Sequence, residues 1–358
     1  MKSEFGTELT FRAATPPVFA RQSAASWRPR PWSCHHAGVS SISHPEKVLF
    51  PDSGITKGEL CAYYESVSPL MLPHVSGRPV TMERYPAGIA KKGFIQKDVA
   101  KGFPEWLRRA EEPRRASKGE GPVHYPLIYE ARDLLWLANQ NCITPHVWSS
   151  RVPNLDQPDV CLFDLDPSAE DPQALRAAAL AVRDLLQELG LGSFVKTSGS
   201  KGFHIAVGLD GETPFEDVWR FAHGVGAVLV KRHPQLLTQE FIKADRGARI
   251  LVDTGRNGRG ATFAAVYAVR AKSGAPVSAP CTWPEIESAA VGPQTFTLRT
   301  MAARLAEVGD LWRRLLTTKI SLRGALVALG GLLTDEDWRE AMAASTRRPT
   351  SRKKAARG

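Results

Sequence analysis

An apolar segment that ends in two aspartates constrains the fold of this chain more than any other feature. It reads Val160-Cys161-Leu162-Phe163-Asp164-Leu165-Asp166-Pro167, and the proline closes it. Side chains alternate between the faces of a strand, so Asp164 and Asp166 point the same way, about 7 Å apart. Carboxylates at a strand's end can bind divalent cations, which take oxygen ligands. On its own, the segment fits a metal site and a buried strand with two solvated aspartates at its end equally well.

Composition sets broad limits on the class of protein. The chain has 358 residues, 43% hydrophobic residues and a formal net charge of +10, which allows one large domain or two smaller ones. The charge favours a polyanionic partner, nucleic acid before an acidic membrane, although a basic soluble protein without such a partner fits as well. The five cysteines contain no Cys-x-x-Cys pair, and their odd number argues against a disulfide framework. Without a membrane-spanning run or a signal sequence, we expect a soluble cytoplasmic protein.

A small-residue turn, Ser198-Gly199-Ser200-Lys201-Gly202, lies between two predicted strands at 193–197 and 203–207. Small residues let backbone N–H groups approach an anion, and the serines and Lys201 can add donors. The turn is not the nucleotide-binding P-loop, which has a different glycine spacing and opens a helix. A hairpin turn without any ligand is the alternative.

A second apolar strand, 249–252, delivers another carboxylate, Asp253, at its tip. Basic residues cluster around it: Lys243, Arg246, Arg249, Arg256, Arg259 and Arg270. A fold that gathers Asp164, Asp166 and Asp253 could hold two Mg²⁺ or Mn²⁺ ions, with Lys201 neutralising a triphosphate. That is the chemistry of nucleotidyl transfer.

Three further sites are weaker candidates. Lys47 and Lys57 flank the turn before a helix with a Thr56/Glu59 capping box, where an anion can bind, but solvated lysines are the simpler reading. Phe94 follows a basic loop, which suits nucleic acid, or else it belongs to the core. His146 ends a predicted strand, where a histidine is more often structural than chemical.

Periodicity and punctuation predict the remaining elements. Helices are expected at 57–71, 127–141, 172–189, 214–232 and 298–316, and strands at 78–85, 93–97, 141–148 and 261–270. Residues 1–38 and the basic tail from 347 to 358 are expected to be flexible.

The three motifs together resemble those of the archaeo-eukaryotic primase superfamily. The Asp-Leu-Asp-Pro run, Thr-Ser-Gly-Ser-Lys-Gly-Phe-His and the Val-Asp strand tip are most similar to the polymerase domain of bacterial ligase D and its stand-alone primase-polymerase relatives. The resemblance extends from about Ser43 to Leu311 and includes His-Pro-Glu-Lys-Val-Leu-Phe-Pro and Phe-Thr-Leu-Arg-Thr-Met. It implies a mixed α/β fold of the primase type, with a sheet like that of RNA-recognition domains, flanking helices and an N-terminal module of helix and strand. The catalytic domain would span 39–318, between a flexible extension at 1–38 and a C-terminal helix with a disordered basic tail at 319–358.

The same resemblance implies roles for individual residues. Asp164, Asp166 and Asp253 would be the catalytic ligands of two Mn²⁺ or Mg²⁺ ions. The incoming nucleotide would be bound by Ser198, Lys201, His204, His146, Arg246 and Arg270. Lys47 and Lys57 would grip a DNA 5′-phosphate, and Phe94 would stack on the template.

The implied activity is template-dependent, ribonucleotide-preferring nucleotidyl transfer in DNA repair. The substrates would be NTP or dNTP and gapped or broken double-stranded DNA, in a bacterial cytoplasm close to the nucleoid. Both gap filling in base excision repair and end joining with a separate DNA ligase and end-binding repair proteins fit. Because no ligase or nuclease motif is present, we expect a stand-alone enzyme.

Two departures from the family pattern and two other classes of function bear on this interpretation. The family often has an aromatic residue and Gln before the Asn that follows the third aspartate, where this chain has Thr254-Gly255-Arg256-Asn257, and Ile95 replaces a second aromatic. A metal-dependent nuclease or an inactive gap-binding protein could also use a basic surface and carboxylates. The Ser198–Gly202 turn argues against the nuclease, since hydrolysis needs no triphosphate site, and three intact carboxylates argue against the inactive binder.

Overall fold

The computed structural model describes residues 41–99, 102–114 and 121–346. The expected flexible extension at 1–38 and basic tail at 347–358 lie outside these residues. No helix in the described part of the chain is long and apolar enough to span a membrane. Within it, the chain has the mixed α/β architecture that the sequence predicts, with one large cluster of buried apolar side chains that includes residues of both main sheets.

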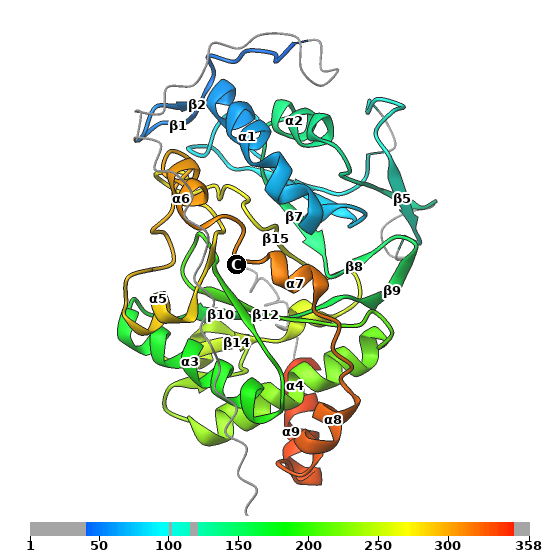
Figure 1. Cartoon of the computed structure of the whole chain (residues 1–358), viewed down its shortest axis with the longest axis vertical. Helices are drawn as coiled ribbons and strands as arrows, with labels where there is room; N and C mark the ends of the chain where they lie inside the picture. Colours follow the sequence, from blue (N-terminus) through cyan, green and yellow to red (C-terminus); the bar gives the residue numbers. More distant parts are fainter. Residues whose placement is uncertain (1–40, 100–101, 115–120, 347–358) are drawn as a thin grey trace, which may run out of the picture. The chain divides into compact units, whose positions relative to one another are not determined.

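The principal sheet has six strands in the order β13-β14-β10-β12-β11-β16 (Figure 1). Their bounds are Leu237–Thr238, Ile250–Asp253, Val160–Pro167, Phe203–Gly208, Phe194–Thr197 and Pro280–Cys281. All neighbouring pairs are antiparallel except β13 and β14. The predicted strand with two aspartates is thus β10, at the centre of the sheet, and β14 carries Asp253 beside it.

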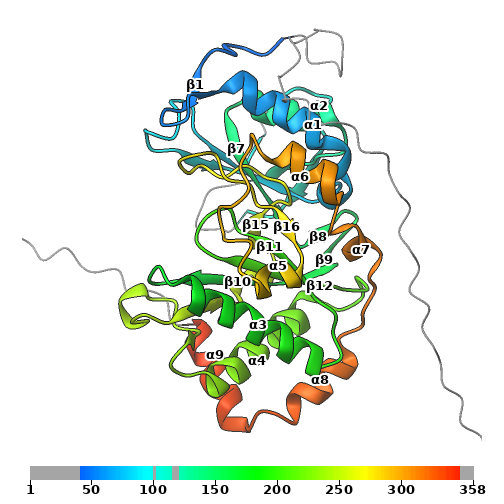
Figure 2. The ribbon, with the colours of Figure 1, turned by 60° about the vertical axis from the view of Figure 1, so that its left-hand side comes forward.

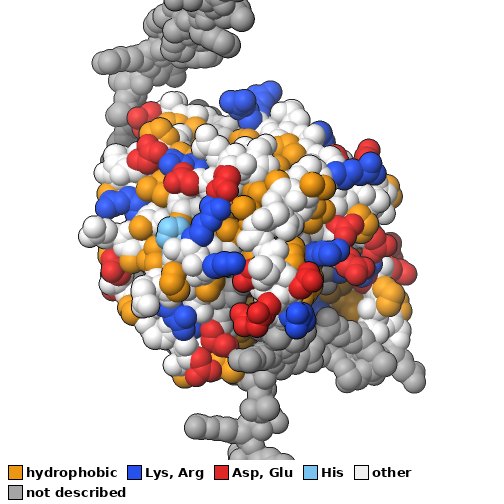
Figure 3. All heavy atoms as spheres, turned by 90° about the horizontal axis from the view of Figure 1, so that it is seen from below, with side chains coloured by type: hydrophobic (Ala, Val, Ile, Leu, Met, Phe, Trp, Pro, Cys, Tyr) orange, Lys and Arg blue, Asp and Glu red, His pale blue; other side chains and the backbone are white. Residues whose placement is uncertain are grey.

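Two amphipathic helices pack against this sheet from the same side, α3 (Pro172–Glu188) and α4 (Phe215–Arg232) (Figures 1 and 2). Asp171 caps α3 by accepting a hydrogen bond from Ala174 N, as the sequence pattern indicates. The C-terminal helices α8 (Arg323–Gly330) and α9 (Asp335–Thr346) then pack on α4. The exposed surface there mixes Lys and Arg with Asp and Glu (Figure 3), so it presents no single sign of charge.

A second sheet has the order β15-β7-β3-β4. Its strands are Thr262–Ala264, Cys142–Trp148, Val80–Arg84 and Phe94–Gln96. Helix α1 (Lys57–Val75) packs on α2 (Ala131–Asn139), which contacts β7. Three two-stranded pairs complete the β structure: β1 (Val48–Phe50) with β2 (Ile55–Thr56), β5 (Arg109–Glu112) with β6 (Val123–Pro126), and β8 (Ser150–Arg151) with β9 (Asn154–Pro158).

Two predicted elements differ most from their expected extent. The strand expected at 261–270 ends at Ala264, because Tyr267 adopts a positive φ of 65° and its N–H bonds to Ser278 O, which turns the chain. The helix expected at 298–316 is two helices, α6 (Met301–Val308) and α7 (Arg313–Thr317). Gly309, at φ 64°, ends the first, and Asp310 accepts hydrogen bonds from Trp312 N and the Tyr267 hydroxyl before the second begins.

A short helix, α5 (Trp283–Glu287), and two 3₁₀ turns, η2 (Lys243–Asp245) and η3 (Gly255–Asn257), make up the remaining regular structure of the described residues. The η3 turn directly follows β14 and contacts β10. It therefore lies next to the aspartates of both strands.

Candidate active site

Four polar residues form one row across the principal sheet. In the strand register, Lys196 of β11 lies opposite His204 of β12, His204 opposite Asp164 of β10, and Asp164 opposite Asp253 of β14. Residues that are directly opposite in neighbouring strands have side chains on the same face, with β-carbons about 5 Å apart. The fold therefore brings together two carboxylates that are distant in the sequence, with a histidine and a lysine beside them.

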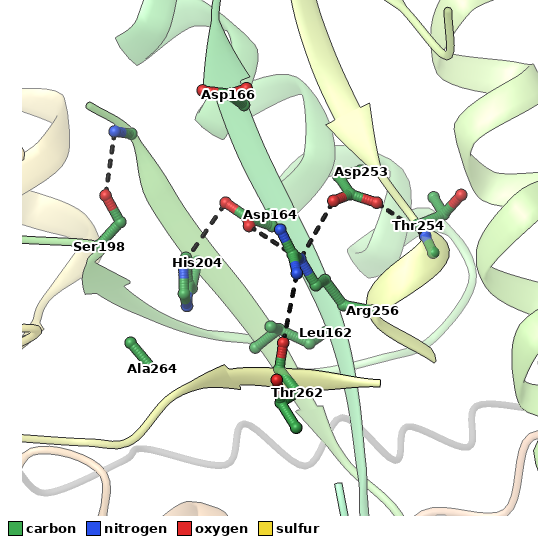
Figure 4. Close-up of polar contacts among 12 residues, drawn as sticks. Leu162, Asp164, Asp166, Ser198, His204, Asp253, Thr254, Arg256, Thr262 and Ala264 are labelled. Carbon is green, nitrogen blue, oxygen red and sulfur yellow. Dashed lines mark hydrogen bonds and ion pairs between the residues drawn. The ribbon is translucent and has the colours of Figure 1, made fainter. Parts of the chain in front are cut away.

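The carboxylates are held by arginines as well as by the sheet, and Figure 4 shows Arg256 in contact with Asp164 and Asp253. Arg256 Nε lies 3.2 Å from Asp164 Oδ2 and 3.1 Å from Asp253 Oδ2. Asp166 stands one step further along β10, and its Oδ2 is 3.1 Å from Arg246 Nη1. Each of the three carboxylates therefore has a guanidinium partner.

Electrostatics set Asp164 apart from an ordinary aspartate. Burial, reinforced by the negative charges of Asp253 and Asp166, raises the pKa of Asp164 to about 6, although Arg256 opposes the shift. Burial alone would lower the pKa of Arg256, but the carboxylates of Asp253 and Asp164 raise it above its usual value. A site that concentrates negative charge in this way favours a bound cation, which would return Asp164 to its ionised form.

The donor chemistry of this cluster fits hard divalent cations. Three carboxylates offer oxygen ligands of the kind that Mg²⁺ and Mn²⁺ take. Across the residues that the structure describes, however, no three His, Cys, Asp or Glu side chains converge closely enough to hold a metal ion. The nitrogen of Arg256 lies between the carboxylates of Asp164 and Asp253, at 3.2 and 3.1 Å.

The turn between β11 and β12 packs directly against β10. Ser198 Oγ accepts hydrogen bonds from Ser200 N and Gly202 N, which closes the turn on itself. Gly202 is required here, because a β-carbon at this position would overlap the carbonyl oxygen of Leu165, the residue between the two aspartates. Lys201 is exposed at the tip, beside a groove of about 540 Å³ that Ser168, Glu170 and Gln294 also line.

Two other predicted nucleotide contacts approach the same region. Arg270 donates through Nη1 to Ser198 O and so connects to the turn. His146 Nε2 lies 3.2 Å from Glu83 Oε2. Burial alone would raise the pKa of Glu83, but His146 and Tyr85 lower it to about 2, so Glu83 stays ionised.

His204 is oriented from behind by a buried lysine. Lys196 is fully buried, and its Nζ contacts His204 Nδ1 at 2.9 Å, Ala264 O at 3.2 Å and the Ser278 hydroxyl. Burial, reinforced by the charge of Arg270, lowers the pKa of Lys196 well below its usual value. A donor at Nδ1 favours the His204 tautomer that carries its ring proton on Nε2, the nitrogen that faces Asp164 Oδ1 at 3.4 Å.

A buried asparagine joins the η3 turn to β10 by hydrogen bonds. Asn257 is fully buried; its Oδ1 accepts from Leu162 N at 2.7 Å, and its Nδ2 donates to Leu162 O at 2.7 Å and to Thr254 O at 3.0 Å. The side chain thus supplies the two hydrogen bonds that a neighbouring strand would make. This fixes the turn that carries Arg256 beside Asp164.

The predicted DNA contacts lie elsewhere in the fold. Phe94 is 47% exposed on β4, with Arg84 over its ring. Lys47 is partly exposed, whereas Lys57 is buried and donates to Ser43 O at 2.7 Å and Ser43 Oγ at 2.8 Å. Of the two lysines, Lys47 is the more accessible.

Sequence reasoning did not assign a role to Lys196, Asn257 or Glu83. Lys196 had a detectable signal, since it lies two residues before Ser198 on a predicted strand next to the strand of His204. Asn257 was noted only as part of a departure from the family pattern, and Arg256 only there and as one of the basic residues around Asp253. Nothing in the sequence alone places Glu83 next to His146, because the pair depends on the register of β3 with β7.

Clustered carboxylates beside a small-residue turn are suited to nucleotidyl transfer, and comparison with known proteins gives the family. A family model described as the LigD primase-polymerase domain matches residues 56–312. The chain therefore belongs to the LigD primase-polymerase domain family, whose members are nucleotidyltransferases that act on DNA.

Individual relatives agree with this assignment. The chain is 34% identical over 284 residues to the multifunctional non-homologous end joining DNA repair protein LigD of Mycobacterium tuberculosis, a match that covers 77% of this chain and 37% of the relative. It is 33% identical over 322 residues to the LigD protein of Pseudomonas aeruginosa, covering 88% of this chain and 37% of the relative. The chain thus spans a little over a third of the length of these relatives.

Among solved structures, the polymerase domain from Mycobacterium tuberculosis ligase D in complex with DNA has the same fold. The TM-score is 0.72 at 33% sequence identity, and the match covers 78% of this chain and 99% of that domain. The expected primase-type fold is therefore confirmed.

Proposed function

We propose that the chain is a template-dependent DNA repair polymerase that adds nucleotides to a 3′ end at a short gap or a broken end. The observation that carries the proposal is the register of β10 and β14, which sets Asp164 opposite Asp253 with Asp166 one step away. The Ser198–Gly202 turn, packed against β10 between the two aspartates of that strand, supports it.

The proposed roles follow from this arrangement. Asp164, Asp166 and Asp253 would hold two Mg²⁺ or Mn²⁺ ions, which lower the pKa of an attacking hydroxyl and neutralise charge on the leaving phosphate. Lys201 and Ser198 are suited to the triphosphate. His204 presents an Nε2 proton as a donor, because Lys196 occupies Nδ1.

The arginines and His146 would complete the nucleotide site. Arg246 is anchored by Glu240 O and Phe241 O and points Nη1 at Asp166, so it can place a fixed positive charge beside the phosphates. Arg270 and the His146–Glu83 pair, with Glu83 ionised, can position the sugar and base. A preference for ribonucleotides is part of this proposal.

DNA recognition would use a different part of the chain. Phe94 offers an exposed aromatic ring for stacking on a template base. Lys47 and Lys57 would bind a downstream 5′-phosphate; for Lys57, this requires the ammonium to leave Ser43. The names of the relatives, which describe non-homologous end joining, favour end joining with a DNA ligase and end-binding proteins over base excision repair.

The polymerase proposal is tested by extension of a labelled primer on gapped DNA and on 3′-overhang ends, with NTP or dNTP and with Mg²⁺ or Mn²⁺. We expect wild-type extension that is lost in Asp164→Asn with Asp166→Asn, while DNA binding is retained. The matched control is Asp184→Asn on the exposed side of α3, which should extend like the wild type. Shortening of the primer, or full extension by the double variant, would refute the assignment.

The 5′-phosphate site is tested by DNA binding. Lys47→Ala with Lys57→Ala should weaken binding to a gap only when the downstream strand is phosphorylated. Equal losses on phosphorylated and unphosphorylated gaps would reduce the two lysines to general basic contacts.

A further inference from the structure

Arg256 lies where a cation shared by the two opposed carboxylates would lie. Its Nε is 3.2 Å from Asp164 Oδ2 and 3.1 Å from Asp253 Oδ2, so one nitrogen bridges both strands (Figure 4). The other oxygens of these carboxylates are occupied elsewhere. Asp253 Oδ1 accepts from Gly255 N at 2.9 Å, and Asp164 Oδ1 faces His204. The Oδ2 atoms are thus the pair that faces across the two strands, and an ion shared by both carboxylates would compete with Arg256 for them.

The two arginines of the site differ in how firmly they are held. Arg246 is 5% exposed, and two backbone carbonyls hold its guanidinium besides Asp166. The side chain of Arg256 is 41% exposed. Apart from the two carboxylates, it donates a long hydrogen bond of 3.4 Å from Nη1 to Thr262 O. Arg256 can therefore rotate toward solvent without its own charge becoming buried and unpaired.

We propose that Arg256 is a displaceable counter-cation: it holds Asp164 and Asp253 in the metal-free enzyme and competes with the divalent ion for them. This inference rests on the proposed metal site. The guanidinium relieves repulsion between two opposed carboxylates while no metal is present. Arg256 would give up these oxygens when a divalent ion binds them. The affinity for metal is thus set partly by an arginine of the chain itself.

The competition has two consequences of opposite sign. Without metal, loss of the positive charge at position 256 leaves like charges facing each other, so the fold is less stable. With metal, the same loss removes a competitor, so the ion binds more tightly. A residue that only filled space would not produce this reversal.

The test is a titration of metal-stripped enzyme with Mn²⁺ alone, in which free Mn²⁺ is measured by electron paramagnetic resonance. We expect Arg256→Gln to lower the Kd for Mn²⁺ about fivefold, the scale of one partly exposed ion pair, and Arg256→Lys to stay near the wild type. The matched control is Arg259→Gln, whose side chain is 44% exposed and pairs with Glu112 and Asp156 instead. This control should not change the Kd.

Thermal unfolding supplies a second readout that does not depend on activity. In EDTA, Arg256→Gln should have a lower melting temperature than the wild type. On addition of Mn²⁺, the melting temperature of Arg256→Gln should rise by more than that of the wild type. Unchanged or weaker Mn²⁺ binding by Arg256→Gln would overturn the inference. Wild-type Mn²⁺ binding that survives Asp164→Asn with Asp253→Asn would instead overturn the metal site itself, so the two failures are distinguishable.

Discussion

The buried amide of Asn257 provides the sharpest test of how the site is built. Asn257→Ala removes both partners of Leu162 on that side of β10, its N–H and its C=O, each bonded at 2.7 Å. Thr254 O keeps its bond from the backbone N–H of residue 257. Two buried backbone groups are therefore stranded, at about 1–3 kcal/mol each, and we expect the free energy of unfolding to fall by about 4 kcal/mol.

The assay is urea unfolding at pH 7 followed by far-ultraviolet circular dichroism. Asn139→Ala is the control, because the Oδ1 of Asn139 also accepts two hydrogen bonds, from Ser43, but at an exposed position. It should cost less than about 1 kcal/mol. If Asn257→Ala costs no more than this control, the amide does not hold the turn of Arg256 against β10.

Two further substitutions test other buried charges. Lys196→Met should reduce primer extension about tenfold or more, because His204 then loses the hydrogen bond that keeps its proton on Nε2. The free energy of unfolding in urea should fall by only about 2 kcal/mol. Unchanged extension would rule out a positioning role for Lys196. Asp159→Asn removes the carboxylate whose Oδ1 lies 2.6 Å from Nη2 of buried Arg78. Burial would raise the pKa of Asp159, but Arg78 and Arg151 lower it below its usual 3.8. The ionised carboxylate therefore stabilises the fold fully above pH 3.8, and this contribution is lost as the pH falls through the lower pKa of the folded state. We expect a cost of about 3 kcal/mol at pH 7 that shrinks in acid, measured by thermal unfolding from pH 3 to 7; a cost independent of pH would contradict it.

Local patterns in the sequence predicted the elements that carry the site. The apolar run from Val160 to Pro167 is β10 with the same bounds, and the capping box at Thr56 and Glu59 begins α1 as expected. These features depend on neighbouring residues alone. The break at Tyr267 depends on a distant contact with Ser278 O, and periodicity could not show it. Gly309 was a local signal for the end of α6, which the expected single helix overlooked.

In the candidate site, too, local patterns in the sequence predicted some residues, and contacts between separate elements determine the others. Alternation within one strand places Asp164 and Asp166 on one face, and the second strand tip identifies Asp253. The bridge that Arg256 makes to Asp164 arises from the register of β14 with β10, two strands that are far apart in sequence. Lys196 and His204 lie on consecutive strands, but their pairing depends on how the turn between these strands closes. The burial of Lys57 against Ser43 likewise depends on how a turn closes on α1, so its side chain could not be oriented from the sequence.

The central claim is that Asp164, Asp166 and Asp253 together hold the metal ions of nucleotidyl transfer. Anomalous diffraction at the manganese edge tests it most directly, on crystals grown with Mn²⁺ and a non-hydrolysable nucleotide. We predict manganese peaks within about 2.3 Å of carboxylate oxygens from all three aspartates, with Arg256 no longer between them. A crystal saturated with Mn²⁺ in which the metal lies elsewhere, and Arg256 still bridges Asp164 and Asp253, would contradict the account.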